Sequence, residues 1–230
     1  MESRQRALVL HRLPYRETSL LLDLFTEQQG RIRLVALGAR RRRSTLQGCL
    51  QVFTPLQIQW RGTGGTLQTL RQAEALSLSL PLTGRALYSA LYINELLCRL
   101  LVPDVSYEAL FGQYLQTLCQ LAASDGQYEP ILRCFEFALL QALGYGVDFQ
   151  RCAATGTLVQ DQVHYRYQAE YGFVTAAVAS QDSFSGQQLR ALAAGQLSDA
   201  ATLRAAKIFS RLAFKPYLGA RPLKSRELFY

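Results

Sequence analysis

The first 80 residues alternate apolar and polar side chains in five short runs, as half-buried β-strands do. The alternation is clearest in "RIRLVAL" and "LQIQW". Two segments that contain glycine, "EQQGR" and "RGTGGT", separate runs and predict hairpin turns. The five strands are therefore expected at residues 6–13, 18–26, 31–39, 50–60 and 66–76.

Five short strands in a segment of this length fit a small closed barrel, and the OB-fold is its five-stranded Greek-key form. Another small barrel, such as an SH3-like fold, would give the same alternation. After residue 84 apolar residues recur at steps of three and four, which predicts α-helices. We expect helices at 86–101, 107–123, 131–143, 185–194 and 198–218, and a hairpin formed by 162–168 and 171–179.

These elements predict an α+β chain: an N-terminal five-stranded OB-fold barrel, then a helical bundle and a small mixed C-terminal region. The expected domains are 1–80 for the barrel and 81–145 for the helices. Residues 146–230 are expected to form the mixed region, docked on the helical domain. No internal repeat or low-complexity linker interrupts this order.

The charge is divided unevenly along the chain. The net charge is +8, with 25 basic and 17 acidic residues. Residues 1–80 carry 12 basic and 5 acidic side chains, and residues 199–230 carry 7 and 2, whereas 81–198 carry 6 and 10. Two basic ends of this kind attract polyanions.

Four adjacent arginines stand between the third and fourth predicted strands. Basic loops and one strand face of an OB barrel form a groove that follows a single-stranded backbone. The alternative is a solvated loop that binds no ligand, since most runs of charged residues are simply exposed to water. The expected DNA-binding residues of the barrel are Arg31, Arg33, Arg40, Arg41, Arg42 and Arg43.

A second basic group lies near the C-terminus. Four cations recur at steps of three, four and four in the last predicted helix, so they share one face. The apolar opposite face should pack inward. The expected DNA-binding residues here are Arg204, Lys207, Arg211 and Lys215, with Lys224 in the segment that follows.

Catalytic motifs are absent from the sequence. There is no Gly-x-Ser-x-Gly, no phosphate loop and no His-Glu-x-x-His, and only His11 and His164 could act as imidazole bases. The five cysteines are scattered and form no Cys-x-x-Cys pair. No apolar run reaches the roughly 18 residues of a membrane span. We expect a non-enzymatic protein of the cytoplasm, associated with the nucleoid.

The whole order of segments resembles the RecO family of bacterial recombination and repair mediators. The resemblance is carried by "YRETSLLLDLFTEQQGRIRLVALGARRRRSTLQGCLQVFTPL", "LYSALYINELL", "RCFEFALLQALGYG" and "LRAAKIFSRLAFKPYLGARPLKSRELF". It implies binding of single- and double-stranded DNA and annealing of complementary strands. It also implies work with RecR to load RecA onto DNA that is coated by single-strand binding protein.

The sequence departs from the RecO pattern at one place. Many members carry a four-cysteine zinc site in the C-terminal region. Here Cys152 stands where a first ligand would be, Thr155 follows three residues on, and no later cysteine exists. Such a site needs four ligands, so we expect no metal and no cofactor.

The resemblance also implies contact with the acidic C-terminal tail of single-strand binding protein. That tail ends in a phenylalanine and needs an apolar pocket with a cation at its rim. Arg133, flanked by Leu132 and Phe135, is the candidate. The alternative interpretation is that Arg133 is a surface arginine that forms an ion pair with Glu129 or Glu136. Other functions that remain open are an RNA-binding or translation-associated OB protein, and a protein adaptor with basic faces.

Overall fold

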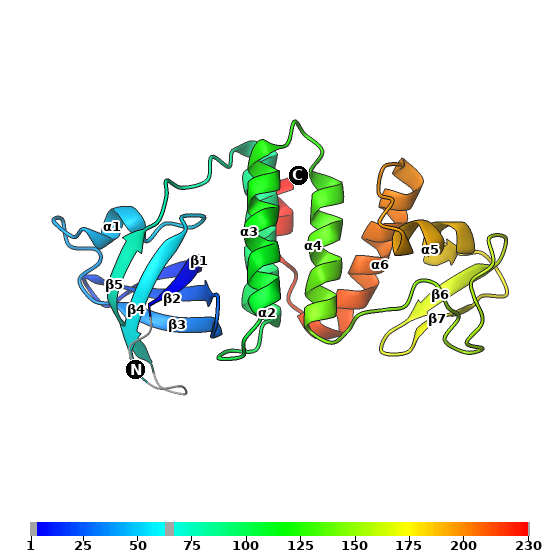
Figure 1. Cartoon of the computed structure of the whole chain (residues 1–230), viewed down its shortest axis with the longest axis horizontal. Coiled ribbons are helices and arrows are strands. Elements are labelled where there is room, and N and C mark those ends of the chain that lie inside the picture. Colours follow the sequence, from blue (N-terminus) through cyan, green and yellow to red (C-terminus); the bar gives the residue numbers. More distant parts are fainter. Residues whose placement is uncertain (1–3, 63–66, 230) are drawn as a thin grey trace. The chain divides into compact units, whose positions relative to one another are not determined.

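The computed structural model describes residues 4–62 and 67–229. The chain forms two compact units: Met1–Gly126 with Leu223–Tyr230, and Gln127–Pro222 (Figure 1). The elements of the first unit are β1 (Gln5–Tyr15), β2 (Ser19–Thr26), β3 (Gly30–Ala36), α1 (Leu46–Cys49), β4 (Leu56–Arg61), β5 (Gln68–Ala75), α2 (Gly84–Leu100), α3 (Glu108–Ala123) and the 3₁₀-helix η1 (Lys224–Phe229).

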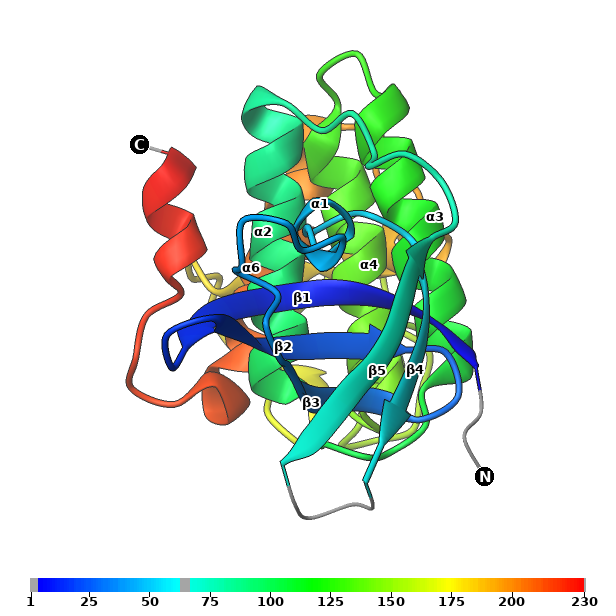
Figure 2. The same cartoon turned by 90° about the vertical axis from the view of Figure 1, so that its left-hand side faces the viewer.

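The five strands close into a barrel in the order β1-β2-β3-β5-β4, and in Figure 2 β4 and β5 cross in front of β1, β2 and β3. All pairs are antiparallel except β3 with β5, which run parallel. This is the OB-like barrel that the alternation predicts, and the α+β class is confirmed. The interior is filled by apolar side chains that alternate along the strands: Ala7, Val9, Leu20, Leu22, Leu24, Ile32, Leu34, Ala36, Leu56, Ile58, Trp60 and Leu70.

The predicted strand at 50–60 is wrong in its first half. Residues 46–49 form α1, and β4 begins only at Leu56. Leu50 is fully buried in the barrel interior, and Phe53 has a left-handed φ of +62° that no strand allows. Pro55 follows and has no N–H for a ladder. This stretch is apolar because it packs against the barrel, and that made it resemble a strand.

Gly30 makes the turn between β2 and β3 possible. Its φ is +70°, and a Cβ built on it would lie 1.8 Å from the carbonyl oxygen of Val105. The hairpin turn predicted at "EQQGR" is confirmed, with turn residues between Thr26 and Gly30. The turn predicted at "RGTGGT" falls largely on residues 63–66, which lie outside the described residues.

Polar and aromatic contacts join α2 and α3 to the barrel. The Asn94 side chain donates to the carbonyl oxygen of Leu10 at 3.0 Å and accepts from the Tyr114 hydroxyl at 2.6 Å. Burial raises the pKa of Tyr114 well above its ordinary value. Phe25 of β2 meets Phe111 of α3 edge-on, with ring centroids 5.3 Å apart. The predicted helices at 86–101 and 107–123 are confirmed.

The second unit packs helices on a small sheet. A hairpin with its turn at 169–171 is confirmed, and β8 is a third strand that the sequence did not reveal. The sheet order is β7-β6-β8. The elements are α4 (Tyr128–Ala142), β6 (His164–Gln168), β7 (Gly172–Thr175), β8 (Ser183–Ser185), α5 (Gly186–Ala193) and α6 (Ala200–Leu218).

Local capping explains where the helices of this unit begin. Ser185 and Gln188 form a reciprocal capping box at the start of α5. The Asp199 carboxylate accepts from the backbone N–H groups of Ala201 and Thr202 at 2.9 and 2.8 Å, which makes it the N-cap of α6.

Phe209 of α6 lies at the centre of the aromatic core of the second unit. Only 1% of its surface is exposed. Its ring lies 4.9–5.7 Å, centroid to centroid, from four others: Phe137, Phe149, Tyr167 and Phe173. Among the described residues, no helix has the length and apolar character needed to cross a membrane.

Candidate nucleic-acid interface

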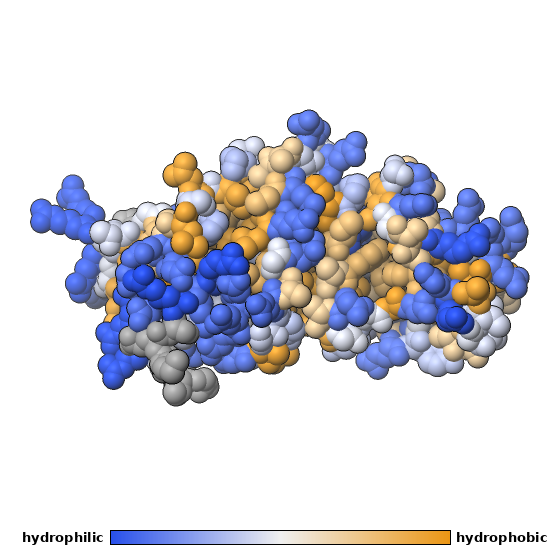
Figure 3. Space-filling model, in the orientation of Figure 1, coloured by the Kyte–Doolittle hydropathy of each residue, from blue (hydrophilic) through white to orange (hydrophobic). Residues whose placement is uncertain are grey.

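The loop from β3 to α1 presents four exposed guanidinium groups: Arg40, Arg41, Arg42 and Arg43, here called the arginine loop. Its backbone is held in place. Ala39 is fully buried in the barrel interior, and the Arg40 N–H donates to the carbonyl oxygen of Thr18 at 2.8 Å. A strongly hydrophilic projection beside α1 marks this loop in Figure 3. A fixed backbone with outward side chains suits a binding loop.

The positive charge of the arginine loop is not neutralised by neighbours. In the described parts of the chain, no carboxylate oxygen lies within 4.0 Å of any of its four side chains. Arg40 Nη1 donates instead to the carbonyl oxygens of Arg16 and Glu17, at 3.5 and 3.3 Å. The turn between β1 and β2 therefore lies beside the loop.

Arg16 adds a fifth exposed cation to this place. Its guanidinium carbon lies 5.3 Å from the centre of the Tyr15 ring. The sequence interpretation missed Arg16 because it stands alone between apolar runs. The sequence does place Arg16 at the end of a predicted strand, on a loop that OB barrels use for binding, and this position could have identified it.

Arg31 and Arg33 of β3 share one buried carboxylate, that of Asp23 on β2. The ion-pair distances are 3.2 and 3.0 Å, and the arginine side chains are 16% and 54% exposed. Arg31 also donates to the carbonyl oxygen of Leu101 at 3.3 Å. The hydrogen bond to Asp23 raises the pKa of Arg33. The Arg31 side chain is therefore held by contacts within the fold, whereas that of Arg33 extends into solvent. Contact of either residue with DNA stays a prediction.

The basic stripe predicted on the last helix lies along α6. Arg204, Arg211 and Lys215 are exposed. Lys207 is half-buried, and its Nζ lies 2.8 Å from Glu129 of α4. Three of the four cations are therefore available, on the opposite side of α6 from Phe209. That these residues bind DNA stays a prediction.

Lys224 belongs to the first unit, in η1. Its backbone N–H donates to Glu95 of α2 at 3.0 Å, and Ser225 donates to the same carboxylate through its N–H and its hydroxyl, at 2.8 and 2.6 Å. Burial raises the pKa of Glu95, but these hydrogen bonds and the charge of Arg99 lower it by more. The pKa of Glu95 therefore lies below its ordinary value. The Lys224 side chain is exposed.

The candidate partner site on α4 is buried. Leu132, Arg133 and Phe135 are 6%, 7% and 0% exposed. Arg133 forms an ion pair of 3.0 Å with Glu136, one of the two pairings that the sequence suggests. Its Nε has no hydrogen-bond partner among the described residues. Binding of a protein tail here stays a prediction.

Cys152 occupies a tight turn in the second unit. It is 1% exposed. Burial raises the pKa of its thiol, but hydrogen bonds from Thr155, Ala154 and Thr175 lower it more, so the pKa is below the ordinary value. Within the described residues, no group of three or more His, Cys, Asp or Glu side chains is placed to hold a metal ion. His11 and His164 are exposed on strands.

Comparison with known proteins covers nearly the whole chain. Residues 1–78 match the family model for recombination protein O N terminal, and residues 81–227 match that for recombination protein O C terminal. The DNA repair protein RecO of Yersinia enterocolitica is 59% identical over 229 residues, covering 100% of this chain and 95% of the relative. That of Pectobacterium atrosepticum is 57% identical, covering 100% and 93%. The chain therefore belongs to the RecO family.

Proposed function

We propose that this protein acts in DNA repair and recombination as a non-enzymatic mediator. It binds single- and double-stranded DNA and anneals complementary strands. The observation that carries the proposal is the arginine loop, with four adjacent exposed guanidinium groups and no carboxylate nearby in the described residues. Membership of the RecO family supports it.

The chemistry of the arginine loop suits phosphate rather than bases. Guanidinium groups bind phosphate oxygens in a forked geometry, and each neutralised phosphate releases counterions. Such contacts carry no sequence information. This suits a strand-annealing protein, which must bind DNA of any sequence. Arg16 and Tyr15 extend the surface along the turn between β1 and β2. A base that stacks on Tyr15 would add affinity only for unpaired DNA.

Annealing needs a second strand near the first. The exposed cations of α6 offer a second phosphate surface in the other unit, and neutralised phosphates repel each other less. We propose that the arginine loop holds one strand while Arg204, Arg211 and Lys215 attract the other. Lys207 contributes less because Glu129 already pairs with it.

Replacing Arg204, Arg211 and Lys215 by glutamine tests this division. Annealing of complementary oligonucleotides coated by single-strand binding protein should slow several-fold, while affinity for a single strand should fall less. A matched variant with Arg151, Arg166 and Arg190 changed to glutamine removes the same charge from exposed positions of the same unit. Equal losses of annealing and affinity would contradict a two-surface mechanism. Stronger competition by RNA than by DNA would favour an RNA-binding protein.

The protein partners belong to the same proposal. With RecR, the protein helps load RecA onto DNA covered by single-strand binding protein. The acidic tail of that protein docks at Arg133, with its terminal phenylalanine near Leu132 and Phe135; since all three are buried, docking requires the neighbouring side chains to move aside. The support is chemical: Arg133 is a buried cation whose Nε lacks a partner in the described residues, so a carboxylate could bind it strongly.

The docking of the tail is tested by neutralising the buried pair as a whole. Arg133→Ala alone would leave the Glu136 carboxylate buried without its ion pair, at a cost of about 3–5 kcal/mol in stability. The double variant Arg133→Gln, Glu136→Gln avoids this. It should weaken tail-peptide binding by about 1.5–3 kcal/mol, the range for a hydrogen bond to a charged group. Calorimetric titration measures the affinity.

Glu136→Gln alone is the matched control for this experiment. It keeps the guanidinium and removes its competing carboxylate, so peptide affinity should hold or rise. Because it also breaks the buried ion pair, at a similar cost of about 3–5 kcal/mol in stability, its fold is checked first by circular dichroism. Naked DNA should bind all three proteins equally, since α4 lies outside the arginine loop and the α6 cations. Unchanged peptide affinity in the folded double variant would remove Arg133 from the site.

A further inference from the structure

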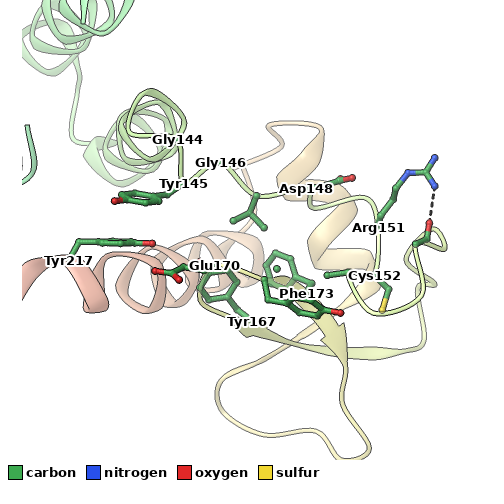
Figure 4. A pocket seen from close by; sticks show the side chains of 15 residues that line it. Gly144, Tyr145, Gly146, Asp148, Arg151, Cys152, Tyr167, Glu170, Phe173 and Tyr217 are labelled. Atoms are coloured by element: carbon green, nitrogen blue, oxygen red, sulfur yellow. Dashed lines mark hydrogen bonds between the residues drawn. The ribbon is translucent and has the colours of Figure 1, made fainter. Parts of the chain in front are cut away.

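An open cavity of about 540 Å³ lies in the second unit, between the end of α4, the β6–β7 hairpin and the end of α6 (Figure 4). Its walls are mainly aromatic. Tyr145 and Tyr217 stack face to face, with ring centroids 3.8 Å apart and planes at 12°. Tyr167, Tyr171 and Phe173 also line it. Tyr145 and Tyr171 are 38% and 57% exposed, so these ring surfaces are open to a ligand.

One carboxylate of this cavity lacks a counterion. Glu170 stands in the turn between β6 and β7 and has a left-handed φ of +64°. Across the described ranges, no Lys, Arg or His nitrogen lies within 4.0 Å of it. In Figure 4 its carboxylate lies close to Tyr217 and Tyr167.

The other charged residues of the lining, Asp148 and Arg151, form hydrogen bonds with neutral backbone groups. Arg151 donates to the carbonyl oxygen of Gly156 at 2.9 Å and points away from the tyrosines (Figure 4). Asp148 accepts from the Gln150 N–H at 2.7 Å. Both keep their charges, and Glu170 is the charged residue that lies beside Tyr167 and Tyr217 in Figure 4.

The pKa values of two tyrosines of the cavity are raised, mainly by burial. Burial raises the pKa of Tyr167, and so does the charge of Tyr217, whereas a hydrogen bond with the Glu170 backbone lowers it and the Glu170 charge raises it less. Burial also raises the pKa of Tyr217, together with Glu170 and Tyr145. A site where added negative charge is disfavoured repels a phosphate group, so DNA is a poor ligand for it. A cation is favoured both by the carboxylate and by the ring faces.

We infer that this cavity binds an arginine side chain presented by a partner protein. The planar guanidinium stacks on the tyrosine rings and forms an ion pair with Glu170. Arginine suits the site better than lysine because its flat, weakly hydrated group both stacks on aromatic faces and matches a carboxylate. This site goes beyond the proposed DNA surfaces and is independent of them.

The probe for this site is a capped peptide, acetyl-Gly-Arg-Gly-amide, and the matched probe carries citrulline, which has nearly the same shape and no charge. Titration of the full chain labelled with ¹³C in its tyrosine rings follows binding by NMR. The arginine peptide should shift the ring signals of Tyr145, Tyr167 and Tyr217. Glu170→Gln should weaken its binding by about twofold to fivefold, the range for an ion pair with an exposed carboxylate.

Asp182→Asn is the control, because Asp182 is an exposed carboxylate of the same unit outside the cavity lining. It should bind the arginine peptide as the unaltered protein does. Equal shifts with the citrulline peptide, or no shift with either, would overturn the inference. So would an oligothymidylate that shifts the same signals. Affinity for DNA should be the same in Glu170→Gln, so failure here is separate from failure of the proposed function.

Discussion

Replacing Arg40, Arg41, Arg42 and Arg43 by alanine should flatten the salt dependence of single-stranded DNA binding. Each lost phosphate contact lowers the slope of log affinity against log salt by about 0.7, so four contacts lower it by about 2.8. If affinities converge near 1 M salt, the loss near 0.1 M is roughly 600-fold. Fluorescence anisotropy with a labelled oligonucleotide across a salt series measures both quantities.

The fold should survive this change, because the four side chains are exposed. Within residues 4–62 and 67–229, Arg40 alone among them has a side-chain hydrogen bond to the barrel, made to backbone carbonyls. The matched control changes Arg85, Arg151, Arg166 and Arg190 to alanine, which removes the same charge from other exposed positions. If the control flattens the slope as much, net charge and not the arginine loop governs binding. A slope that does not change in the loop variant would show that the loop does not touch phosphate.

Phe209→Ala should lower the free energy of unfolding of the second unit by about 3–5 kcal/mol, the range for a buried aromatic side chain. The cause is a cavity at the meeting point of four other rings, where each edge-on contact is lost as well. The one tryptophan, Trp60, lies in the barrel and does not report on this unit. Hydrogen exchange of the α6 amides is the suitable measurement.

Phe209→Leu is the companion variant. It should lower the free energy of unfolding clearly less than Phe209→Ala does, because most of the buried volume is kept. Arg204→Gln, on the exposed side of the same helix, should leave exchange within about 0.5 kcal/mol of the unaltered protein. Equal protection of α6 in Phe209→Ala and the unaltered protein would mean that the ring cluster does not hold this helix.

The strands and helices with strong periodicity could be predicted from the sequence. Residues 31–36 alternate because one face of β3 fills the barrel and the other does not. The three-and-four spacing of Leu110, Phe111, Tyr114 and Leu118 follows from burial of one side of α3. The Asp199 cap is a local hydrogen-bonding pattern, and such patterns can be read without tertiary structure.

The remaining features depend on contacts between distant residues. The four residues of α1 and the three of β8 are too short to show a period. Asp23 lies opposite Arg33 only because β2 and β3 pair in one register. Burial of Arg133 depends on packing around α4, and its spacing alone resembles that of an exposed cation. The cavity is formed by residues from three separate segments, such as Tyr145, Glu170 and Tyr217, so no sequence motif predicts it.

The return of η1 to α2 has a consequence for how the chain is made and cut. The first unit is interrupted after Gly126 and resumes at Leu223, so the second unit is an insertion within it. During synthesis the second unit can fold as soon as Pro222 has emerged, whereas Glu95 must wait for Lys224 and Ser225. A protease that cuts once between 127 and 222 leaves the contacts of η1 to hold the two fragments together. Release of the second unit requires two cuts, one on each side of it.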